Sequence, residues 1–149
     1  MSNGIKVKKR NGRGTESLNL EKMHKMVEEA TKGVAGVSAS QVEIQSGIQF
    51  YDGITTDEIQ EILIKSASDL IDLDHPNYQF VAARLLLFAI RKQIYGKMRD
   101  LPHLETHIMS CTSQDVYDKD IFTKYSKEEI DKVNGYIDHE RDFLFTYAG

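Results

Sequence analysis

Two long apolar patterns within residues 55–96 constrain the fold of this chain more than any other feature of its sequence. The first follows Thr55-x-x-Glu58, which has the form of a helix capping box, and its apolar residues recur at helical spacing. These residues are Ile59, Ile62, Leu63, Ala67, Leu70 and Ile71. The second begins at Pro76, a residue suited to the first turn of a helix, and ends at Gly96. It is apolar on nearly all sides, so we expect its helix at the centre of a mainly helical core.

Similar boundary signals predict two earlier helices. Asn19 is a good N-cap, and apolar residues follow at helical spacing until Gly33. Ser38-x-x-Gln41 has the form of another capping box and predicts a helix that ends near residues 52–53. Residues 19–96 therefore predict four helices packed as a bundle.

The N-terminal end of the chain predicts a β-hairpin. Ile5 and Val7 alternate with charged residues, Asn11-Gly12 is a turn signal, and residues 15–18 alternate again. The predicted fold class is α+β and mostly α, with this hairpin as a lid on the four-helix bundle.

The helical pattern is interrupted at residues 97–103, where we place a domain boundary. The sequence thus predicts one domain over residues 1–96 and a second, partial helical segment over residues 97–149. In that segment we expect a short helix over 104–112, a loop with turns over 117–126, and a helix from the capping box Ser126-x-x-Glu129 to about residue 138.

Large apolar side chains crowd the C-terminal end of the sequence, and no later element follows to cover them. They are Phe143, Leu144, Phe145 and Tyr147. We therefore expect this end to be cut from something larger or to meet a partner.

The composition excludes several classes of protein. The chain has 149 residues, of which 40% are hydrophobic and 28% charged, with 2 Pro and 10 Gly, which is typical of a folded globular chain and not of a disordered one. It has neither a membrane-length apolar run nor the apolar core of a signal peptide, so we expect a cytoplasmic location and no membrane partner. A single cysteine, Cys111, excludes an internal disulfide and a multi-cysteine zinc site.

Positive charge is concentrated at the start of the chain, although the net charge is -4. No acidic residue precedes Glu16, and the basic residues before it are Lys6, Lys8, Lys9, Arg10 and Arg13. Such an element can attract nucleic acid, or it can hold a polyanion as small as a triphosphate.

Strand alternation places two of these charges on the packing side of the hairpin. If Ile5 and Val7 face the helices, Lys9 does too, and Glu16 shares the side of Leu18. An unpaired charge there costs on the order of several kcal/mol. Two alternatives follow: the two residues pair with each other at the rim, or they line a pocket in which lysine meets phosphate and the carboxylate accepts from a base or ribose.

Further polar residues lie near helix ends. Thr56 and Gln60 are one turn apart at the start of the helix that follows Thr55, where free N–H groups and the helix dipole favour an anion. Lys92 lies at the end of the next helix, where a cation suits the dipole. A purely structural role is the alternative for both residues: a Thr near a helix start is more often a cap than a ligand contact, and Lys92 suits the helix dipole without a ligand.

Three stretches of the chain carry a family resemblance. VKKRNGRGTESLNLEKMHKMV, VSASQVEIQSGIQFYDGITTDEIQEILIKSASDLI and PNYQFVAARLLLFAIRKQIYG resemble the ATP-cone and its flanks at the start of the large subunit of class I ribonucleotide reductase. YIDHERDFLFTYA is similar to the segment that leads toward the catalytic barrel of that family. The resemblance covers essentially the whole chain, with one extra residue around Arg13-Gly14.

The resemblance implies an allosteric site for overall activity, at which ATP switches the enzyme on and dATP switches it off by changing subunit association. It implies that Lys9, Arg10 and Lys92 neutralise phosphates, and that Glu16 and Lys22 hold the base and sugar. The full set of matched positions is Val7, Lys9, Arg10, Glu16, Asn19, Lys22, Thr56, Gln60 and Lys92.

At position 60 the chain departs from its close relatives, which carry histidine, and a neutral amide there implies altered affinity or altered preference for dATP. The implied ligands and partners are ATP or dATP with Mg²⁺, the remainder of the large subunit, and the small radical-bearing subunit.

The catalytic cysteines of that family are missing from this chain, and Cys111 matches a position without a catalytic role. We therefore assign no catalytic residue and expect no reductase turnover by this chain alone. His103 and His107 have the i, i+4 spacing of metal ligands, but HLETH is not HExxH and no third ligand is evident, so we assign no metal site. A nucleic-acid-binding or structural interaction module that uses the basic hairpin is the alternative function.

Overall fold

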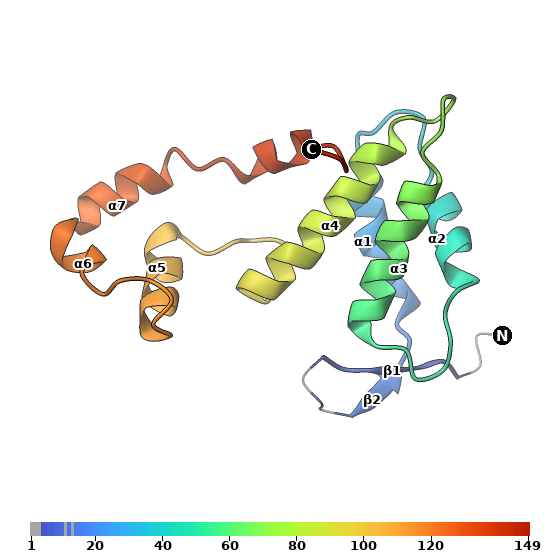
Figure 1. Ribbon diagram of the computed structural model, residues 1–149, viewed down its shortest axis with the longest axis horizontal. Helices are drawn as coiled ribbons and strands as arrows, with labels where there is room; N and C mark the ends of the chain where they lie inside the picture. The colour runs from blue at the N-terminus through green and yellow to red at the C-terminus, as the bar shows by residue number, and fades with distance from the viewer. Residues whose placement is uncertain (1–3, 11, 13) are drawn as a thin grey trace. The chain divides into compact units, whose positions relative to one another are not determined.

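The computed structural model describes residues 4–10, 12 and 14–149. It is a mostly helical α+β structure that divides into two compact units, residues up to 90 with 143–149, and residues 91–142 (Figure 1). Asn11 and Arg13 lie outside the described residues, so the Asn-Gly turn and the extra residue near Arg13-Gly14 stay predictions. The predicted boundary between functional regions at residue 96 also stays a prediction.

The first unit begins with the predicted hairpin. Strands β1 (Lys6–Lys8) and β2 (Thr15–Ser17) pair antiparallel, with Val7 opposite Glu16. Val7 is buried, as strand alternation predicts for a residue that faces the helices.

The second edge of β1 is also hydrogen-bonded, which the sequence did not predict. The backbone N–H of Lys8 donates to the carbonyl of Ile54 at 2.9 Å, and that of Gly53 donates to the carbonyl of Lys6 at 2.8 Å. The N–H of Lys6 donates to Oδ1 of Asp52 at 2.8 Å. The hairpin is therefore attached to the segment that leads into the third helix.

Four helices of this region follow the predicted order: α1 (Leu20–Thr31), α2 (Ala39–Gly47), α3 (Thr56–Asp69) and α4 (Tyr78–Tyr95). Two predicted caps are confirmed. The side chain of Asn19 accepts from the N–H of Lys22 at 3.0 Å, and Thr55 and Glu58 form the reciprocal capping box of α3.

Two predictions for α2 are wrong. Ser38 is its N-cap residue, but its side chain makes no capping hydrogen bond; instead, its N–H donates to the hydroxyl of Tyr78 at 3.0 Å. The helix also ends at Gly47, well before residues 52–53. The physical reason is that residues 52–54 are used by β1, which requires a backbone that leaves the helix.

The core of the first unit is formed by side chains from all four helices and from the loop before α3. Its largest fully buried apolar side chains are Val27, Val42, Ile54, Leu63, Val81, Leu85 and Phe88. The expectation that α4 lies at the centre of the core holds for one side only, because Leu86 and Ile90 remain 38% and 42% exposed. Helix α4 is covered mainly on the side that carries Leu85 and Phe88.

The C-terminal segment returns to α4. The ring of Phe143 packs edge-on against Phe88 at 6.1 Å between centroids, and the guanidinium of Arg84 lies 5.1 Å from the centre of the Phe143 ring. The N–H of Tyr147 donates to the carbonyl of Gln79 at 3.1 Å. No later element was expected to cover Phe143, and it is an element far earlier in the sequence, α4, that contacts its ring. Phe145 remains 60% exposed.

The second unit contains α5 (Leu104–Ser113), α6 (Ile121–Lys124) and α7 (Lys127–Asn134). The predicted helix after residue 103 and the capping box of Ser126 and Glu129 are confirmed. The predicted loop contains α6. Helix α7 ends at Asn134, earlier than expected, because the next N–H groups, those of Tyr136 and Ile137, donate to carbonyls three residues back instead of four. A short 3-10 helix, η1, spans His139–Leu144.

Among the residues that the structure describes, no helix combines the length and the apolar character needed to span a membrane.

Candidate nucleotide-binding site

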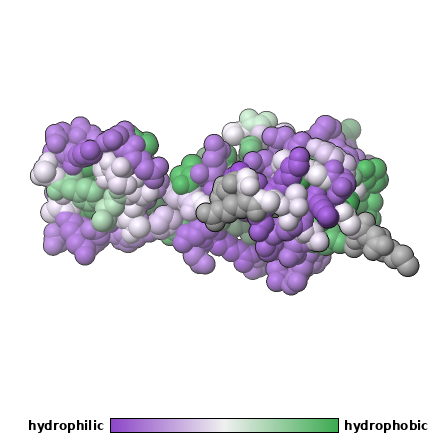
Figure 2. All heavy atoms as spheres, turned by 90° about the horizontal axis from the view of Figure 1, so that it is seen from below, coloured by the Kyte–Doolittle hydropathy of each residue, from purple (hydrophilic) through white to green (hydrophobic). Residues whose placement is uncertain are grey.

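The basic hairpin is tied to the first turn of α3 by an ion pair. Nε of Arg10 donates to Oδ1 of Asp57 at 2.7 Å, and Nη2 of Arg10 contacts the same oxygen. Asp57 is the second residue of α3, whose first N–H groups have no partner within the helix. The structure thus brings the guanidinium of Arg10 to the N-terminus of α3, which is the positive end of the helix dipole. The carboxylate of Asp57 offsets both the charge of the guanidinium and the dipole. The surface around the hairpin is mainly hydrophilic (Figure 2).

Lys9 and Glu16 pair with each other. Nζ of Lys9 lies 2.9 Å from Oε2 of Glu16, and the two side chains are 46% and 41% exposed. The prediction that these two charges are buried between hairpin and helices is therefore wrong. The structure instead has the first alternative, in which the two residues pair with each other at the rim. The reason is that β1 ends at Lys8, so the strand alternation that buries Val7 no longer positions Lys9.

The pKa of Glu16 is also affected by a charge on α1, that of Lys22. The hydrogen bond from Lys9 lowers the pKa of the Glu16 carboxyl, partial desolvation opposes this, and the charges of Lys9 and Lys22 lower it further. Lys22 is the third residue of α1, and its backbone N–H donates to the side chain of the N-cap residue Asn19. The predicted residues Lys9, Glu16, Asn19 and Lys22 therefore gather where the hairpin enters α1.

Thr56 and Gln60 lie one turn apart on α3, as predicted, but in different surroundings. Thr56 is the half-buried first residue of the helix. Gln60 is 5% exposed, and its Nε2 donates to the backbone carbonyl of Leu85 at 3.1 Å. Its amide is therefore engaged with α4. Lys92 is half-buried on the last turn of α4 and belongs to the second compact unit, so its part in the site stays a prediction.

Sequence analysis predicted the capping box of Thr55 and Glu58 but missed Tyr51, which joins the preceding loop to it. The hydroxyl of Tyr51 donates to Oε1 of Glu58 at 2.7 Å, and the N–H of Thr55 donates to Oε2 at 2.8 Å. These bonds, the one from Tyr51 foremost, lower the pKa of the Glu58 carboxyl, and the same bond raises the pKa of Tyr51. Asp57 was missed as well. Asp57 could have been found from its position, because an acidic residue in the first turn of a helix is a natural partner for a basic hairpin.

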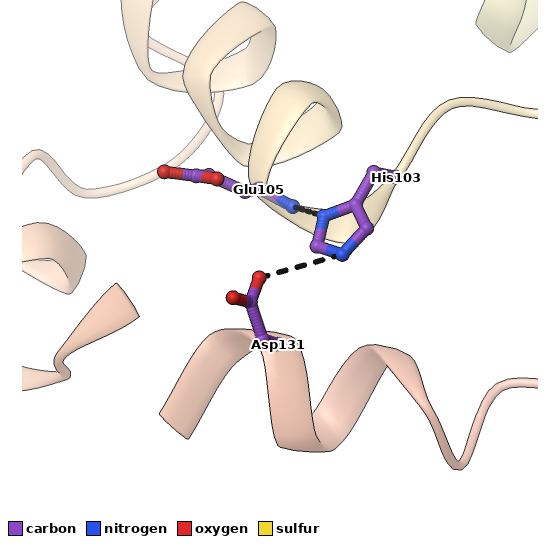
Figure 3. A group of neighbouring side chains, drawn as sticks. All are labelled: His103, Glu105 and Asp131. Atoms are coloured by element: carbon purple, nitrogen blue, oxygen red, sulfur yellow. Dashed lines mark hydrogen bonds and ion pairs between the residues drawn. The ribbon is translucent and has the colours of Figure 1, made fainter. Parts of the chain in front are cut away.

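A second cluster, in the 91–142 unit, has the composition of a metal site. His103, Glu105 and Asp131 offer ligand atoms within 4.8 Å of one another (Figure 3). Both ring nitrogens of His103 have partners, however: Nδ1 accepts from the N–H of Glu105 at 3.2 Å, and Nε2 lies 3.4 Å from Oδ1 of Asp131. Because Nδ1 accepts, Nε2 carries the proton, so the ring caps α5 and pairs with α7.

His107, the other histidine of the predicted i, i+4 pair, has different neighbours. Its ring packs edge-on against Tyr95 at 5.0 Å and Tyr117 at 5.9 Å, and Nε2 lies 3.6 Å from Sγ of Cys111. The two histidines thus serve separate contacts.

Comparison with known proteins gives a family. A model of the ATP cone domain matches residues 5–93, which span the hairpin and almost all of α1 to α4. Ribonucleoside-diphosphate reductase alpha subunits are similar over nearly the whole chain. That of Haemophilus influenzae is 45% identical over 148 residues, and the alpha subunit of ribonucleoside-diphosphate reductase 1 of Escherichia coli is 44% identical over 148 residues. The subunit of Enterobacteria phage T4 is 40% identical over 137 residues.

The alignments cover nearly all of this chain but only a small part of each relative. The Haemophilus and Escherichia alignments cover 99% of this chain and 19% of the relative, and the phage alignment covers 91% and 18%. The chain therefore spans about a fifth of the length of the reductase subunits it matches. Because the domain model matches more than half of its residues, the chain belongs to the ATP-cone family.

Proposed function

We propose that this chain is the nucleotide-responsive regulatory region of a ribonucleotide reductase large subunit, which binds ATP or dATP and so controls overall activity in deoxyribonucleotide synthesis. The observation that carries the proposal is the match of the ATP cone domain to residues 5–93, within which Arg10 of the hairpin is held at the first turn of α3. A cation at a helix N-terminus is a setting that suits a phosphate group.

In the proposed site, the phosphates interact with Lys9 and Arg10 and with the first N–H groups of α3 at Thr56. The base and sugar lie toward the start of α1, near Glu16 and Lys22. Val7, Asn19, Gln60 and Lys92 complete the set proposed from the resemblance. We further propose that the triphosphate binds with Mg²⁺, and that β1 and β2 act as a lid on a bundle of α1 to α4.

Regulation through such a site requires a difference in affinity between two states. An effector shifts a subunit equilibrium only by as much as it binds one association state more tightly than the other. We propose that the partners in this equilibrium are the remainder of the large subunit and the small radical-bearing subunit. Residues 1–96 would sense the nucleotide, and residues 97–149 would lead to the catalytic body.

Isothermal titration calorimetry of the purified chain with ATP and with dATP tests the proposal. We expect heat of binding for the parent and at least about tenfold weaker binding for Lys9→Ala, which corresponds to about 1.4 kcal/mol for a lost charge-assisted contact. Lys65→Ala is the matched control, because Lys65 pairs with Asp69 at the opposite end of α3 and should leave affinity unchanged.

The possible outcomes distinguish a failure of the proposed function from a failure of the role proposed for Lys9. No binding of either nucleotide by the parent would contradict the proposed function, whereas equal affinities of parent and Lys9→Ala would remove only Lys9 from the site. The nucleic-acid alternative makes a different prediction: duplex DNA would bind in place of nucleotide, and its affinity would collapse between about 50 and 200 mM salt.

A further inference from the structure

We infer that Asp57 is a built-in competitor for the phosphates of the effector: it holds Arg10 when no nucleotide is bound and has to release it when a polyphosphate arrives. This inference rests on the proposed function of the hairpin and α3. It concerns Asp57, a residue that is not among the positions implied by the resemblance.

The geometry of the pair uses the part of Arg10 that would bind phosphate. Both Nε and Nη2 of Arg10 approach the same oxygen of Asp57, so two donors along one edge of the guanidinium are occupied. A guanidinium binds phosphate through such an edge, with two parallel N–H donors. Asp57 and a phosphate therefore compete for the same donors.

The position of Asp57 adds a second effect. It is the second residue of α3, where a carboxylate is stabilised by the helix dipole and the free N–H groups. A phosphate that approaches these groups meets a negative charge already in place. The side chains of Arg10 and Asp57 are 42% and 53% exposed, so an incoming anion can reach the pair from solvent.

Glu16 is in a similar relation to Lys9, but it is a less direct test. The carboxylate of Glu16 pairs with Lys9 at 2.9 Å and is also proposed to contact the base or sugar. Its removal would therefore free Lys9 and, at the same time, remove a proposed contact with the nucleotide. Asp57 has no such proposed contact with the ligand. Its removal therefore isolates the competition.

The expected size of the effect follows from the exposure of the pair. Exposed ion pairs and the repulsion between a carboxylate and a phosphate together correspond to about three- to tenfold in affinity. The Asp57→Asn variant of the full chain should therefore bind ATP about three- to tenfold more tightly than the parent in calorimetry at constant ionic strength. Inorganic tripolyphosphate, which lacks the base and sugar, should show the same gain.

Asp69→Asn is the matched control. It makes the same change of charge on the same helix, but Asp69 lies at the far end of α3 and pairs with Lys65 at 2.7 Å. We expect its affinity for ATP to equal that of the parent. A gain in Asp69→Asn as large as in Asp57→Asn would show that net charge alone is responsible, and would overturn the inference.

A double-mutant cycle tests whether the competition acts through Arg10. In an Arg10→Gln background, Asp57→Asn should give a clearly smaller gain than in the parent, because there is no guanidinium left to release and only the repulsion between the carboxylate and the phosphate is removed. A full gain in that background, or unchanged or weaker ATP binding by Asp57→Asn in the parent background, would overturn the competitor role while the proposed function stands. Absence of ATP and tripolyphosphate binding in every variant would instead contradict the proposed function itself. Circular dichroism of each variant establishes that α3 is intact.

Discussion

The side-chain amide of Gln60 donates a hydrogen bond to the backbone carbonyl of Leu85 at 3.1 Å and thereby connects α3 to α4 inside the core. The residue is 5% exposed, so this bond forms away from water. Position 60 was selected from the sequence as a neighbour of the nucleotide, yet in the structure its amide takes part in helix packing. Any effect of this position on effector binding therefore comes together with an effect on how α3 and α4 are held.

Gln60→Ala should lower the free energy of unfolding by about 1–3 kcal/mol, because it removes a buried hydrogen bond and leaves a small cavity. Urea denaturation followed by circular dichroism measures the change. Glu61→Ala, at the exposed neighbouring position on α3, is the control and should stay within about 0.5 kcal/mol of the parent. An equal, small effect of both substitutions would show that the Gln60 amide contributes nothing to stability.

Two helix N-caps of similar sequence should respond differently to alanine. Thr55 accepts a hydrogen bond from the N–H of Glu58 and completes a capping box, whereas the Ser38 side chain makes no capping bond. Thr55→Ala should therefore cost about 1 kcal/mol of stability, and Ser38→Ala clearly less. Thermal unfolding of the two variants side by side provides the comparison. A larger loss for Ser38→Ala would contradict the assignment of the caps.

Phe143 should anchor the C-terminal segment, since its ring contacts Phe88 and the guanidinium of Arg84. Phe143→Ala removes an aromatic pair and a cation–π contact and should lower the free energy of unfolding by about 1–3 kcal/mol. Phe145→Ala changes a ring of the same kind that is 60% exposed, and should have an effect below about 0.5 kcal/mol. Chemical denaturation distinguishes the two, and equal losses would argue against a specific role of Phe143.

His24 should make the contact between α1 and α2 depend on pH. Nδ1 of its ring lies 2.6 Å from Oε1 of Glu43 on α2, and Nε2 lies 3.1 Å from Oε1 of Glu28. The hydrogen bond to Glu43, and then its charge, raises the pKa of His24 above the ordinary value of 6.5. Because the folded state holds the proton more tightly, the stabilisation is complete below pH 6.5 and is lost as the pH rises through the raised pKa.

Denaturation of the parent and of His24→Gln over this range of pH tests the expectation. The difference in stability between the two proteins should shrink as the pH rises. If the difference in stability stays constant with pH, the charge of the imidazolium does not contribute to stability. If the difference grows as the pH rises, the pKa of His24 is lowered in the folded state and not raised.

Local signals predicted much of the helical part of the fold. The N-cap role of Asn19 and the capping boxes at Thr55 and Ser126 were readable because a cap contacts backbone groups within three residues of itself. The burial of Val7 followed from strand alternation alone. The residues of the candidate site were proposed from charge, caps and the family resemblance, and their contact with a nucleotide stays a prediction.

What the sequence by itself determined, then, is the order of the hairpin and the first four helices and most of their N-caps, because caps and apolar spacing depend on near neighbours. Only the tertiary structure decided the partners: Asp57 for Arg10, Leu85 for Gln60, Phe88 for Phe143, and the loop before α3 for the open edge of β1. These contacts join residues far apart along the chain. Their choice depends on how several elements pack at once, and no local pattern records it.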